Sequence, residues 1–504
     1  MKPIKELLLH KKELGTISVT PSLGSRPNGE CFKRNLENIK NNTFAYREGI
    51  FSFDDIDYQH FPIYSLGGGD PMANKSYTGL NNKVKKLLSS TKLSYYNYTA
   101  GNKSHRKVVL EYLNKIGIST ITEEDGSRAP IGEDNIIFTS STSHGFSLVL
   151  SVLLRPYDVV LFTGPTYGLF AYYPERVGGI TKLVELKKED GFVINPNSLA
   201  ARIDEINSEL KAKYADKLSY QPRVVAFLNE NPHNPMGTVL SIKDKEKLYA
   251  VATVCESRGV FIIDDLIYRD LGYDRKNLAL PIASESKYFN STISLFGLSK
   301  AYGLAGLRAG IVVGNKMIIA AIRDLIFQNM DSLSLVQSEA IAYCFNSYNS
   351  TKYTRYFKKV IDHYLVNLEI VKYLVYGSEN DKEMNFTKKK AKQALKRTLK
   401  KEYLNFINNN LGLKFAGDCL PDSGFFAILD FSSLKGKQCK GITINNEDDL
   451  LYYAFKYAHV KFITGQSMGW PNKDELIARI TFSMKKEDLI HRLNLLRKAL
   501  NNLN

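Results

Sequence analysis

The segment from Gly297 to Gly310 reads Gly-Leu-Ser-Lys-Ala-Tyr-Gly-Leu-Ala-Gly-Leu-Arg-Ala-Gly and directly follows the apolar run Thr292 to Phe296. A single lysine, Lys300, stands among small residues, and Arg308 follows eight positions later. Small residues let a ligand approach the backbone closely, and the planar guanidinium of arginine binds phosphate well. The pattern predicts a lysine held beside an anionic ligand. A glycine-rich loop with an incidental lysine and arginine is the alternative.

Short runs of β-branched and aromatic residues recur from about residue 100 to 345 and alternate with helix-like segments. Strands that alternate with helices predict an α/β fold with a mostly parallel sheet. Ligands gather at the carboxyl ends of the strands in such sheets, so the residues just after each strand are the first candidates for chemistry. The predicted strands are Ile136 to Phe138, Val159 to Phe162, Val224 to Leu228, Val260 to Ile263, Thr292 to Phe296 and Ile311 to Val313.

One of these strand patterns, Phe261 to Ile263, runs into two carboxylates, Asp264 and Asp265, and Tyr268 stands three residues beyond them. A carboxylate at the end of a strand can keep a pyridine nitrogen protonated, which makes the ring an electron sink. The alternative is that both aspartates only cap the following helix. We keep that alternative for Asp264 and take Asp265 as a candidate for chemistry.

Two polar turns also follow strand patterns. Residues 229–238 read Asn-Glu-Asn-Pro-His-Asn-Pro-Met-Gly-Thr, and their prolines favour a turn in which His233 has no catalytic part. Residues 139–143, Thr-Ser-Ser-Thr-Ser, precede a helix pattern, and the start of a helix binds phosphate well. Ser141 and Thr142 are therefore phosphate candidates, although helix capping explains them equally well.

Taken in their order along the chain, the motifs resemble those of the class I/II aminotransferases, which are pyridoxal-phosphate enzymes of fold type I. The family's lysine signature, S-x-S-K followed by G-x-R-x-G, is similar to residues 297–300 and 306–310. The resemblance covers roughly residues 61 to 375 and 415 to 500. It implies a large α/β domain, with a mostly parallel sheet covered by helices on both faces, and a smaller α+β domain.

The catalytic residues that this resemblance implies come from the strand ends. Lys300 would form the internal Schiff base with pyridoxal 5'-phosphate. The family pattern D-x-x-Y falls on Asp265, which would pair with the ring nitrogen, and on Tyr268, which would bond the ring's phenolic oxygen. The pattern N-P-x-N-P-T-G makes Asn234 the second donor to that oxygen, with Met236 in place of the usual threonine.

The resemblance also implies a set of phosphate ligands. Arg308 would grip the phosphate, together with Ser141, Thr142 and Ser299. The first Ser or Thr of the family's lysine signature is Gly297 here, which leaves one phosphate hydrogen bond unassigned.

Two tyrosines match family positions around the cofactor. Tyr167, which follows Pro165, would stack on the pyridine ring. Tyr96, which stands five residues before Gly101, would reach across the interface of a homodimer to the neighbour's phosphate.

The resemblance implies three residues of the substrate site. Arg479 would bind the α-carboxylate of the substrate as a bidentate pair, although an arginine on an edge strand is the alternative. Gly69 and Asn234 would line the same site. The sequence does not name the substrate, but three aromatic residues favour an apolar or aromatic side chain: Tyr64, Phe425 and Phe426.

We therefore expect an aminotransferase that moves an amino group between an amino acid and a 2-oxo acid by a ping-pong mechanism. Other pyridoxal-phosphate chemistry at the α-carbon stays open: a lyase, an eliminase like aminocyclopropane-carboxylate synthase, a decarboxylase or an oxidase. A non-catalytic regulator with an aminotransferase-like domain is the further alternative. Such a protein needs a separate DNA-binding module, and residues 1–60 show no helix-turn-helix pattern.

The chain of 504 residues carries a net charge of +16, and the densest basic segment lies outside these motifs. Between Asp381 and Glu402 the sequence has nine basic and three acidic residues, in a pattern typical of a helix. A basic helix can bind nucleic acid or an anionic membrane, but a solvated basic face is the simpler interpretation. We expect neither nucleic acid nor a membrane as a partner.

Five scattered cysteines, with no CxxC pair, argue against a disulfide framework and a structural zinc site, so no metal is expected. The first residues lack the apolar core of a signal peptide, and we expect a cytoplasmic protein. The expected organisation is an N-terminal extension over 1–60, the first part of the small domain with the substrate loop over 61–100, the large domain over 101–345, and the rest of the small domain over 346–504 with a lysine-rich insertion at about 376–414.

Overall fold

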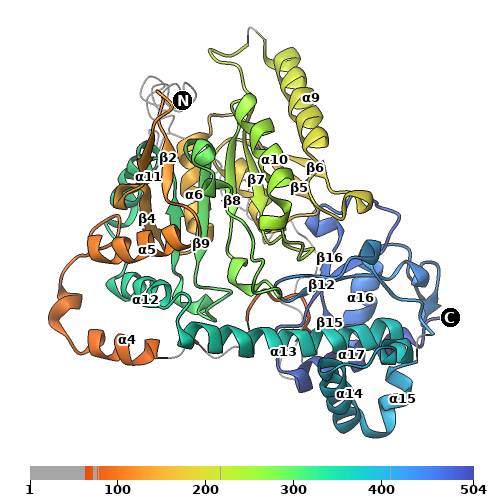
Figure 1. The fold of residues 1–504 in the computed structure, drawn as a ribbon. Helices are drawn as coiled ribbons and strands as arrows, with labels where there is room; N and C mark the ends of the chain where they lie inside the picture. The colour runs from red at the N-terminus through yellow and green to blue at the C-terminus, as the bar shows by residue number, and fades with distance from the viewer. Residues whose placement is uncertain (1–62, 72–75, 78, 216, 409) are drawn as a thin grey trace, which may run out of the picture. The chain divides into compact units, whose positions relative to one another are not determined.

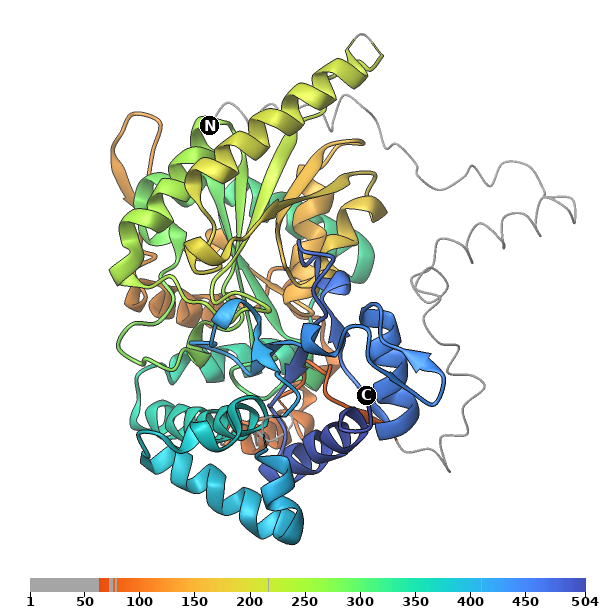
Figure 2. The same ribbon diagram turned by 90° about the vertical axis from the view of Figure 1, so that its right-hand side faces the viewer.

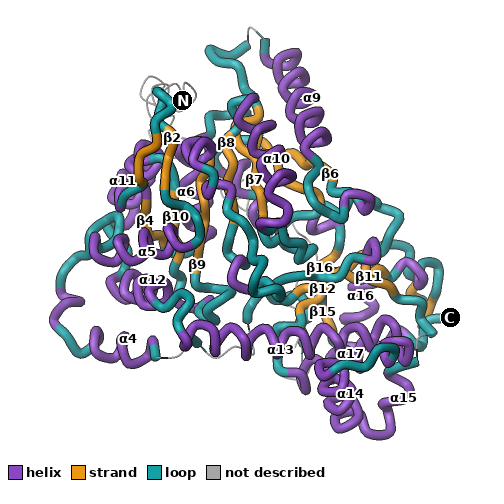
Figure 3. The backbone as a smooth tube through the Cα atoms, viewed as in Figure 1, coloured by secondary structure: helices purple, strands orange, loops and turns teal. Residues whose placement is uncertain are grey.

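The computed structural model describes residues 63–71, 76–77, 79–215, 217–408 and 410–504 (Figure 1). The extension expected over residues 1–60 lies outside the described residues. Residues 64–504 form one compact unit that contains a sheet of seven strands and a second sheet of four (Figure 3). Among the described residues, no helix combines the length and the apolar character that a membrane crossing needs.

The large sheet has the strand order β4-β10-β9-β8-β7-β5-β6. Its strands are β4 (Ile136–Thr139), β5 (Val159–Gly164), β6 (Ile180–Glu185), β7 (Val224–Glu230), β8 (Phe261–Asp265), β9 (Thr292–Gly297) and β10 (Gly310–Val313). Only β10 runs antiparallel to its neighbours, so the sheet is mostly parallel, as the alternation of strands and helices predicts.

The large sheet contains all six predicted strands and one strand that the prediction missed. Six strands are buried along their whole length, which explains their continuous apolar runs. The missed strand, β6, lies at the edge of the sheet and is mostly half-buried. Thr181 and Lys182 interrupt its apolar pattern because β6 is partly open to solvent, whereas the other edge strand, β4, is fully buried.

Helices lie on both sides of the large sheet (Figure 2). The apolar helix α6 (Thr142–Leu153) packs against β4, β9 and β10, whereas α10 (Lys245–Ser257) contacts β8 and α9 (Pro196–Tyr214) contacts β6 and β7. This confirms the predicted α/β architecture. It leaves the loops at the carboxyl ends of the strands as the place where polar residues can gather.

The second sheet is antiparallel, with the order β11-β12-β17-β16. Its strands are β11 (Lys414–Phe415), β12 (Phe426–Asp430), β16 (Ile463–Thr464) and β17 (Ile477–Thr481). The long helix α13 (Thr351–Tyr376) contacts β11 and also the turn Arg269–Leu271 that follows β8. It therefore connects the second sheet to the catalytic edge of the large one (Figure 1).

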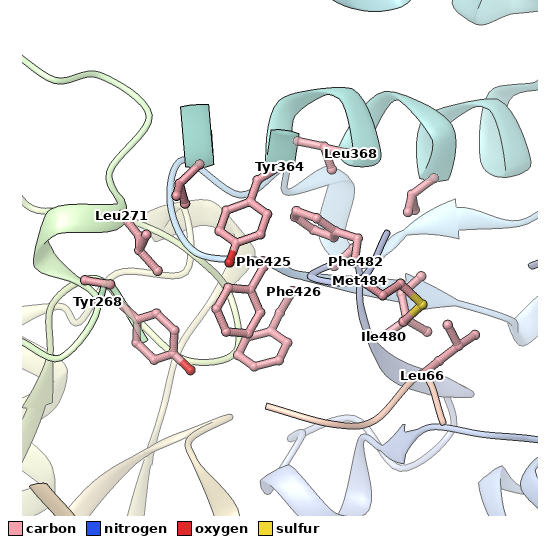
Figure 4. Close-up of a cluster of buried hydrophobic side chains, with 14 of the residues drawn as sticks. Leu66, Tyr268, Leu271, Tyr364, Leu368, Phe425, Phe426, Ile480, Phe482 and Met484 are labelled. Atoms are coloured by element: carbon pink, nitrogen blue, oxygen red, sulfur yellow. The ribbon is translucent and has the colours of Figure 1, made fainter. Parts of the chain in front are cut away.

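A column of aromatic side chains fills the space between this helix and the large sheet (Figure 4). Tyr364 of α13 packs on Phe425, with ring centroids 5.3 Å apart, and Phe425 packs on Tyr268 at 5.7 Å. Each such pair contributes about 0.5–1.5 kcal/mol beyond the area that it buries. The loop after β8 is therefore fixed to the second sheet through Tyr268.

The lysine-rich segment contains the predicted helix, α14 (Phe386–Leu399), which packs against α13 and α17 (Lys486–Leu500). Leu395 and Leu399 face the core, and the helix bears its exposed lysines on the opposite side. The remaining helices are α4 (Leu80–Leu88), α5 (Lys103–Lys115), α7 (Gly168–Ala171), α8 (Tyr173–Arg176), α11 (Lys316–Met330), α12 (Leu335–Asn346), α15 (Tyr403–Phe406) and α16 (Glu447–Ala458). The remaining strands form three short pairs, namely β1 (Tyr64–Ser65) with β15 (Val460–Lys461), β2 (Thr120–Thr122) with β3 (Arg128–Pro130), and β13 (Gln438–Cys439) with β14 (Ile442–Thr443).

The backbone of the turn before α6 packs directly against β10. An ideal Cβ on Gly310 would lie 2.4 Å from the carbonyl carbon of Ser141 and 2.5 Å from the amide nitrogen of Thr142. Both atoms belong to the backbone and cannot move aside as a flexible side chain would. Only glycine at position 310 lets this turn approach the sheet.

We expect Gly310→Ala to lower the free energy of unfolding by at least about 1–3 kcal/mol, because the new methyl group overlaps the Ser141 backbone. Urea unfolding of the cofactor-free protein measures the change. Gly306→Ala is the matched control, since a Cβ there meets nothing within 4 Å. Equal stability of the two variants would contradict the close approach.

Candidate active site

Lys300 follows β9 and reaches a loop that is distant in the sequence. Its Nζ donates a hydrogen bond to the carbonyl oxygen of Gly69, at 2.6 Å. Burial lowers the pKa of Lys300 to about 8; the positive charges of Arg479 and Arg308 lower it too, while Asp70 and Asp265 act in the opposite direction. The structure therefore brings Lys300 and Gly69 together and favours a neutral amine near pH 8.

Asp265 is the last residue of β8 and is buried, and its Oδ1 accepts a hydrogen bond from the amide of Ile267 at 3.1 Å. Burial raises the pKa of Asp265 to about 7; the amide of Ile267 and the charge of Lys300 oppose this shift, whereas Asp264 adds to it. A partner with a positive charge would favour the ionised form of this carboxyl.

Asp264 points to different partners, and its predicted role as a cap of the following helix is wrong. Its carboxylate accepts hydrogen bonds from Asn229 Nδ2 at 2.7 Å and from the amide of Ile282 at 3.0 Å. The short helix after β8 has no side-chain cap. Successive side chains of a strand point to opposite faces, so Asp264 joins β8 to β7 while Asp265 faces the site.

Arg479, on β17, is a buried cation without a carboxylate partner among the described residues. Its Nη1 donates to Asn234 Oδ1 at 3.2 Å and its Nη2 to the carbonyl of Gly67 at 2.9 Å, while its Nε is buried without a hydrogen bond. The guanidinium lies over the ring of Phe426, 4.1 Å from its centroid. Burial lowers the pKa of Arg479. A buried charge of this kind favours binding of an anion.

Tyr268, Tyr167 and Asn234 surround this arginine. Burial raises the pKa of Tyr268 and of Tyr167, and the positive charge of Arg479 opposes both shifts. Because Asn234 Oδ1 accepts from Arg479, the amide group of Asn234 keeps its NH2 as a donor. The structure thus places these three predicted residues in one site with Asp265 and Lys300.

The phosphate candidates lie where α6 begins. Ser141 has a φ of 147°, a conformation that favours glycine, and its Oγ accepts from the amide of His144 at 3.1 Å. Ser141 is therefore the N-cap of α6, which supports the capping interpretation for its hydroxyl and leaves its backbone for a ligand.

Thr142 explains why the lysine signature begins with Gly297. Thr142 Oγ1 donates to the carbonyl of Phe296 at 3.3 Å, and an ideal Cβ on Gly297 would lie 2.4 Å from that hydroxyl oxygen. A serine or threonine at position 297 would displace it. The hydroxyl of Thr142 thus occupies space that a larger residue at 297 would need.

The other cofactor candidates differ in exposure. Ser299 is buried beside Lys300, and Arg308 is exposed with its Nη1 on the carbonyl of Ala305 at 3.0 Å. Tyr96 is 89% exposed, and within the described residues it makes no hydrogen bond or ring contact with the other candidates. The charge of Arg308 acts on Lys300, whereas no interaction among the described residues joins Tyr96 to this site.

The three aromatic residues that were expected near the substrate lie in different environments. Phe426 supports Arg479, Phe425 is fully buried in the aromatic column, and Tyr64 packs edge-on against His491 at 5.3 Å. The sequence analysis missed the role of Phe426 under the arginine. It also gave no role to Glu230, a buried carboxyl at the end of β7. The structure draws attention to Glu230 because it stands opposite Asp265 in the pairing of β7 with β8.

The sequence model of the family "Aminotransferase class I and II" matches residues 73–494. The chain belongs to this family. A relative named aspartate aminotransferase, from Geobacillus stearothermophilus, is 30% identical over 290 residues, which are 56% of this chain and 63% of the relative. A probable N-acetyl-LL-diaminopimelate aminotransferase from Bacillus subtilis is 28% identical over 58% of this chain and 65% of its own. The alignments therefore span less than two thirds of these aminotransferases.

Solved structures of the family share the fold. An aspartate aminotransferase from Rhizobium meliloti has a TM-score of 0.66 at 17% identity, with 95% of this chain and 100% of that chain covered. A variant of the Thermus thermophilus aspartate aminotransferase has a TM-score of 0.62 at 18% identity, with 88% and 98% covered. Within the described ranges, no group of three His, Cys, Asp or Glu residues is placed to hold a metal ion.

We expect the cofactor-free protein to take up pyridoxal phosphate faster as the pH rises through about 8. Only the neutral amine reacts with an aldehyde, and burial lowers the pKa of Lys300 to about 8. The initial rate of the visible absorbance change, measured from about pH 6 to about pH 11.5, reports this dependence. An inflection near the ordinary lysine value of about 10.4 would contradict it.

Proposed function

We propose that this chain is a pyridoxal-phosphate-dependent aminotransferase that moves an amino group between an amino acid and a 2-oxo acid in a ping-pong cycle. The observation that carries the proposal is that Lys300 and Arg479 bind the same loop, since Lys300 Nζ donates to the carbonyl of Gly69 at 2.6 Å and Arg479 Nη2 donates to the carbonyl of Gly67 at 2.9 Å. A reactive amine beside a buried cation that has no carboxylate partner among the described residues suits a substrate that bears a carboxylate next to the reacting carbon.

The residues of this site fit pyridoxal phosphate. Asp265 is a buried carboxyl at a strand end, Thr142 lies at the start of α6, and Gly297 and Gly310 leave room where a Cβ would strike the Ser141–Thr142 turn. When bound, the cofactor supplies an aldehyde that combines with amines and a ring that withdraws electrons from the α-carbon. Lys300 would hold the aldehyde carbon, and Asp265 would keep the ring nitrogen protonated.

The other residues would orient the cofactor. Tyr268 and the NH2 group of Asn234 would donate to the ring oxygen, and Tyr167 would stack on the ring face. The phosphate ligands would be Ser141, Thr142, Ser299 and Arg308, through the start of α6 and the guanidinium.

Substrate binding would depend on Arg479. Its guanidinium would hold the α-carboxylate, supported from below by Phe426, so that the α-hydrogen faces Lys300. The neutral amine of Lys300 would then take the α-proton and deliver it to the cofactor carbon that carried the aldehyde. Gly69, whose carbonyl already binds Lys300, would line the substrate mouth.

We infer a homodimer in which Tyr96 completes the phosphate site of the neighbouring copy, since Tyr96 is 89% exposed within one chain. The expected domain division at residues 61–100, 101–345 and 346–504 belongs to the same proposal. A cytoplasmic location follows from the scattered cysteines, and neither nucleic acid nor a membrane is included as a partner.

A half-reaction separates transamination from the other chemistries. With one amino acid and no oxo acid, we expect one equivalent of oxo acid and of pyridoxamine phosphate per site. Lys300→Ala should lose both products and the lysine-dependent visible absorption, whereas Lys389→Ala, in the exposed lysine face of α14, should keep them. Release of ammonia, an alkene, carbon dioxide or peroxide would favour a lyase, an eliminase, a decarboxylase or an oxidase.

Arg479→Ala should raise the KM for amino acids roughly 10- to 100-fold, because hydrogen bonds to charged groups are each worth about 1.5–3 kcal/mol. Its effect on the dissociation constant of pyridoxal phosphate should be much smaller. Arg308→Ala is the reciprocal control and should weaken cofactor binding more than it raises KM. Steady-state kinetics and cofactor titration measure both quantities. If Arg479→Ala lost affinity for amino acids and for the cofactor equally, this arginine would not be the specific ligand of the substrate carboxylate.

A further inference from the structure

Glu230 is a buried carboxyl for which the proposed chemistry has no use. It is the last residue of β7, and in the register of the parallel pair β7–β8 it stands opposite Asp265. Partners in this register point to the same face of a sheet, so Glu230 lies on the side of the sheet that bears the site. Its side chain is enclosed, with 8% of the residue exposed.

The carboxyl of Glu230 binds the turn that carries Tyr167. Thr166 Oγ1 donates to Glu230 Oε2 at 2.9 Å, and the amide of Tyr167 donates to the same carboxyl. Thr166 is also held from the other side, because its amide donates to the carbonyl of Met468 at 2.8 Å. The turn between β5 and α7 is thus fixed by Glu230 on one side and by the loop of the second sheet on the other.

The nearby His233 does not form an ion pair with Glu230, although its Nε2 lies 3.8 Å from Glu230 Oε2. His233 Nδ1 accepts from the amide of Met236 at 3.3 Å, so the ring proton is on Nε2. That proton is donated to Thr163 Oγ1 at 2.9 Å, since the Thr163 hydroxyl donates its own hydrogen to the carbonyl of Pro165. Burial lowers the pKa of His233 to about 3, which keeps the ring neutral.

The charge of Glu230 follows from these surroundings. Burial raises the pKa of Glu230 well above its usual range, and the neighbouring Asp265 carboxylate raises it further. The Thr166 hydroxyl, the Tyr167 amide and the charge of Arg479 act in the opposite direction without restoring the usual value. These surroundings therefore favour the neutral form of Glu230 beside Asp265.

We propose that Glu230 is a positioning residue, a neutral acid that anchors the Thr166–Tyr167 turn to the end of β7 and so holds Tyr167 against the cofactor ring beside Asp265. A neutral carboxyl can accept both hydrogen bonds from the turn without adding a second negative charge next to Asp265. This leaves Asp265 as the single anion for the ring nitrogen. The inference rests on the proposed function in that it assumes pyridoxal phosphate in this site.

The test compares Glu230→Gln with Glu230→Leu. Glutamine keeps a neutral acceptor for Thr166 and Tyr167, so the dissociation constant of pyridoxal phosphate should stay within about threefold and the circular dichroism of the bound cofactor should be unchanged. Leucine removes two net hydrogen bonds of about 1 kcal/mol each, and binding should weaken by about tenfold or more with an altered dichroism band. If Glu230 acted through a negative charge, glutamine would not preserve cofactor binding, so preserved binding in Glu230→Gln supports the proposal.

Two further variants show whether Glu230 acts through the turn. Thr166→Val removes one of the two donors and should weaken cofactor binding by about fivefold, with little further loss in the Glu230→Leu background. Likewise, Glu230→Leu should add little once Tyr167→Leu has removed the stacked ring. If Glu230→Leu fails to fold, Thr166→Val and Glu230→Gln still decide the question.

Asp158→Asn is the matched control. This buried carboxyl, beside the start of β5, accepts from the amides of Arg155 at 2.9 Å and Arg223 at 3.2 Å, so its loss should lower the melting temperature without changing the cofactor dissociation constant. An effect of Glu230→Gln as large as that of Glu230→Leu would overturn the proposal, as would unchanged cofactor binding in Thr166→Val. None of these readouts requires turnover, so a chain that binds the cofactor but forms no oxo acid would refute the proposed transamination and leave this test valid.

Discussion

The enclosure of Lys300, Asp265 and Arg479 at one edge of the large sheet is the constraint on which the site depends. Charged groups lose their hydration there, and only part of that loss is returned by their mutual attraction. The pKa of the lysine falls, that of the aspartate rises, and the arginine keeps an unbonded Nε. An anionic ligand would give the buried arginine the charged partner that it lacks among the described residues.

Two sheets are needed to build this enclosure. The large sheet contributes Lys300 and Asp265, the second sheet contributes Arg479, and the early loop contributes Gly69. Contacts between these parts are short: Lys300 binds Gly69, and Arg479 binds Asn234 and Gly67. The aromatic column through Tyr268 fixes the distance between the sheets, so that a change in packing there would move the arginine relative to the lysine.

The sequence contains most of this architecture, because buried strands and their polar ends have local patterns. Lys300, Asp265 and Asn234 each follow a continuous apolar run, and the structure brings all three together. The edge strand β6 was missed because solvent on one side removes the apolar run, and Asp264 was misread because its partners, Asn229 and Ile282, are distant in the sequence. The role of Glu230 depends on strand register, which a single sequence does not encode locally.

The charged groups of the protein differ in their exposure to solvent: the basic helix α14 carries exposed lysines, whereas the candidate site holds enclosed charges. Three of its lysines are exposed: Lys389, Lys390 and Lys396. No lysine of α14 is among the groups that shift the pKa of Lys300, Asp265 or Arg479. Mobile ions screen exposed charges beyond a Debye length of about 8 Å at physiological ionic strength, but they scarcely reach enclosed ones. Added salt therefore acts on electrophoretic mobility and solubility through α14. Its effect on the pKa of Lys300 is limited to screening the exposed charges of Asp70 and Arg308, because burial is the main cause of that shift.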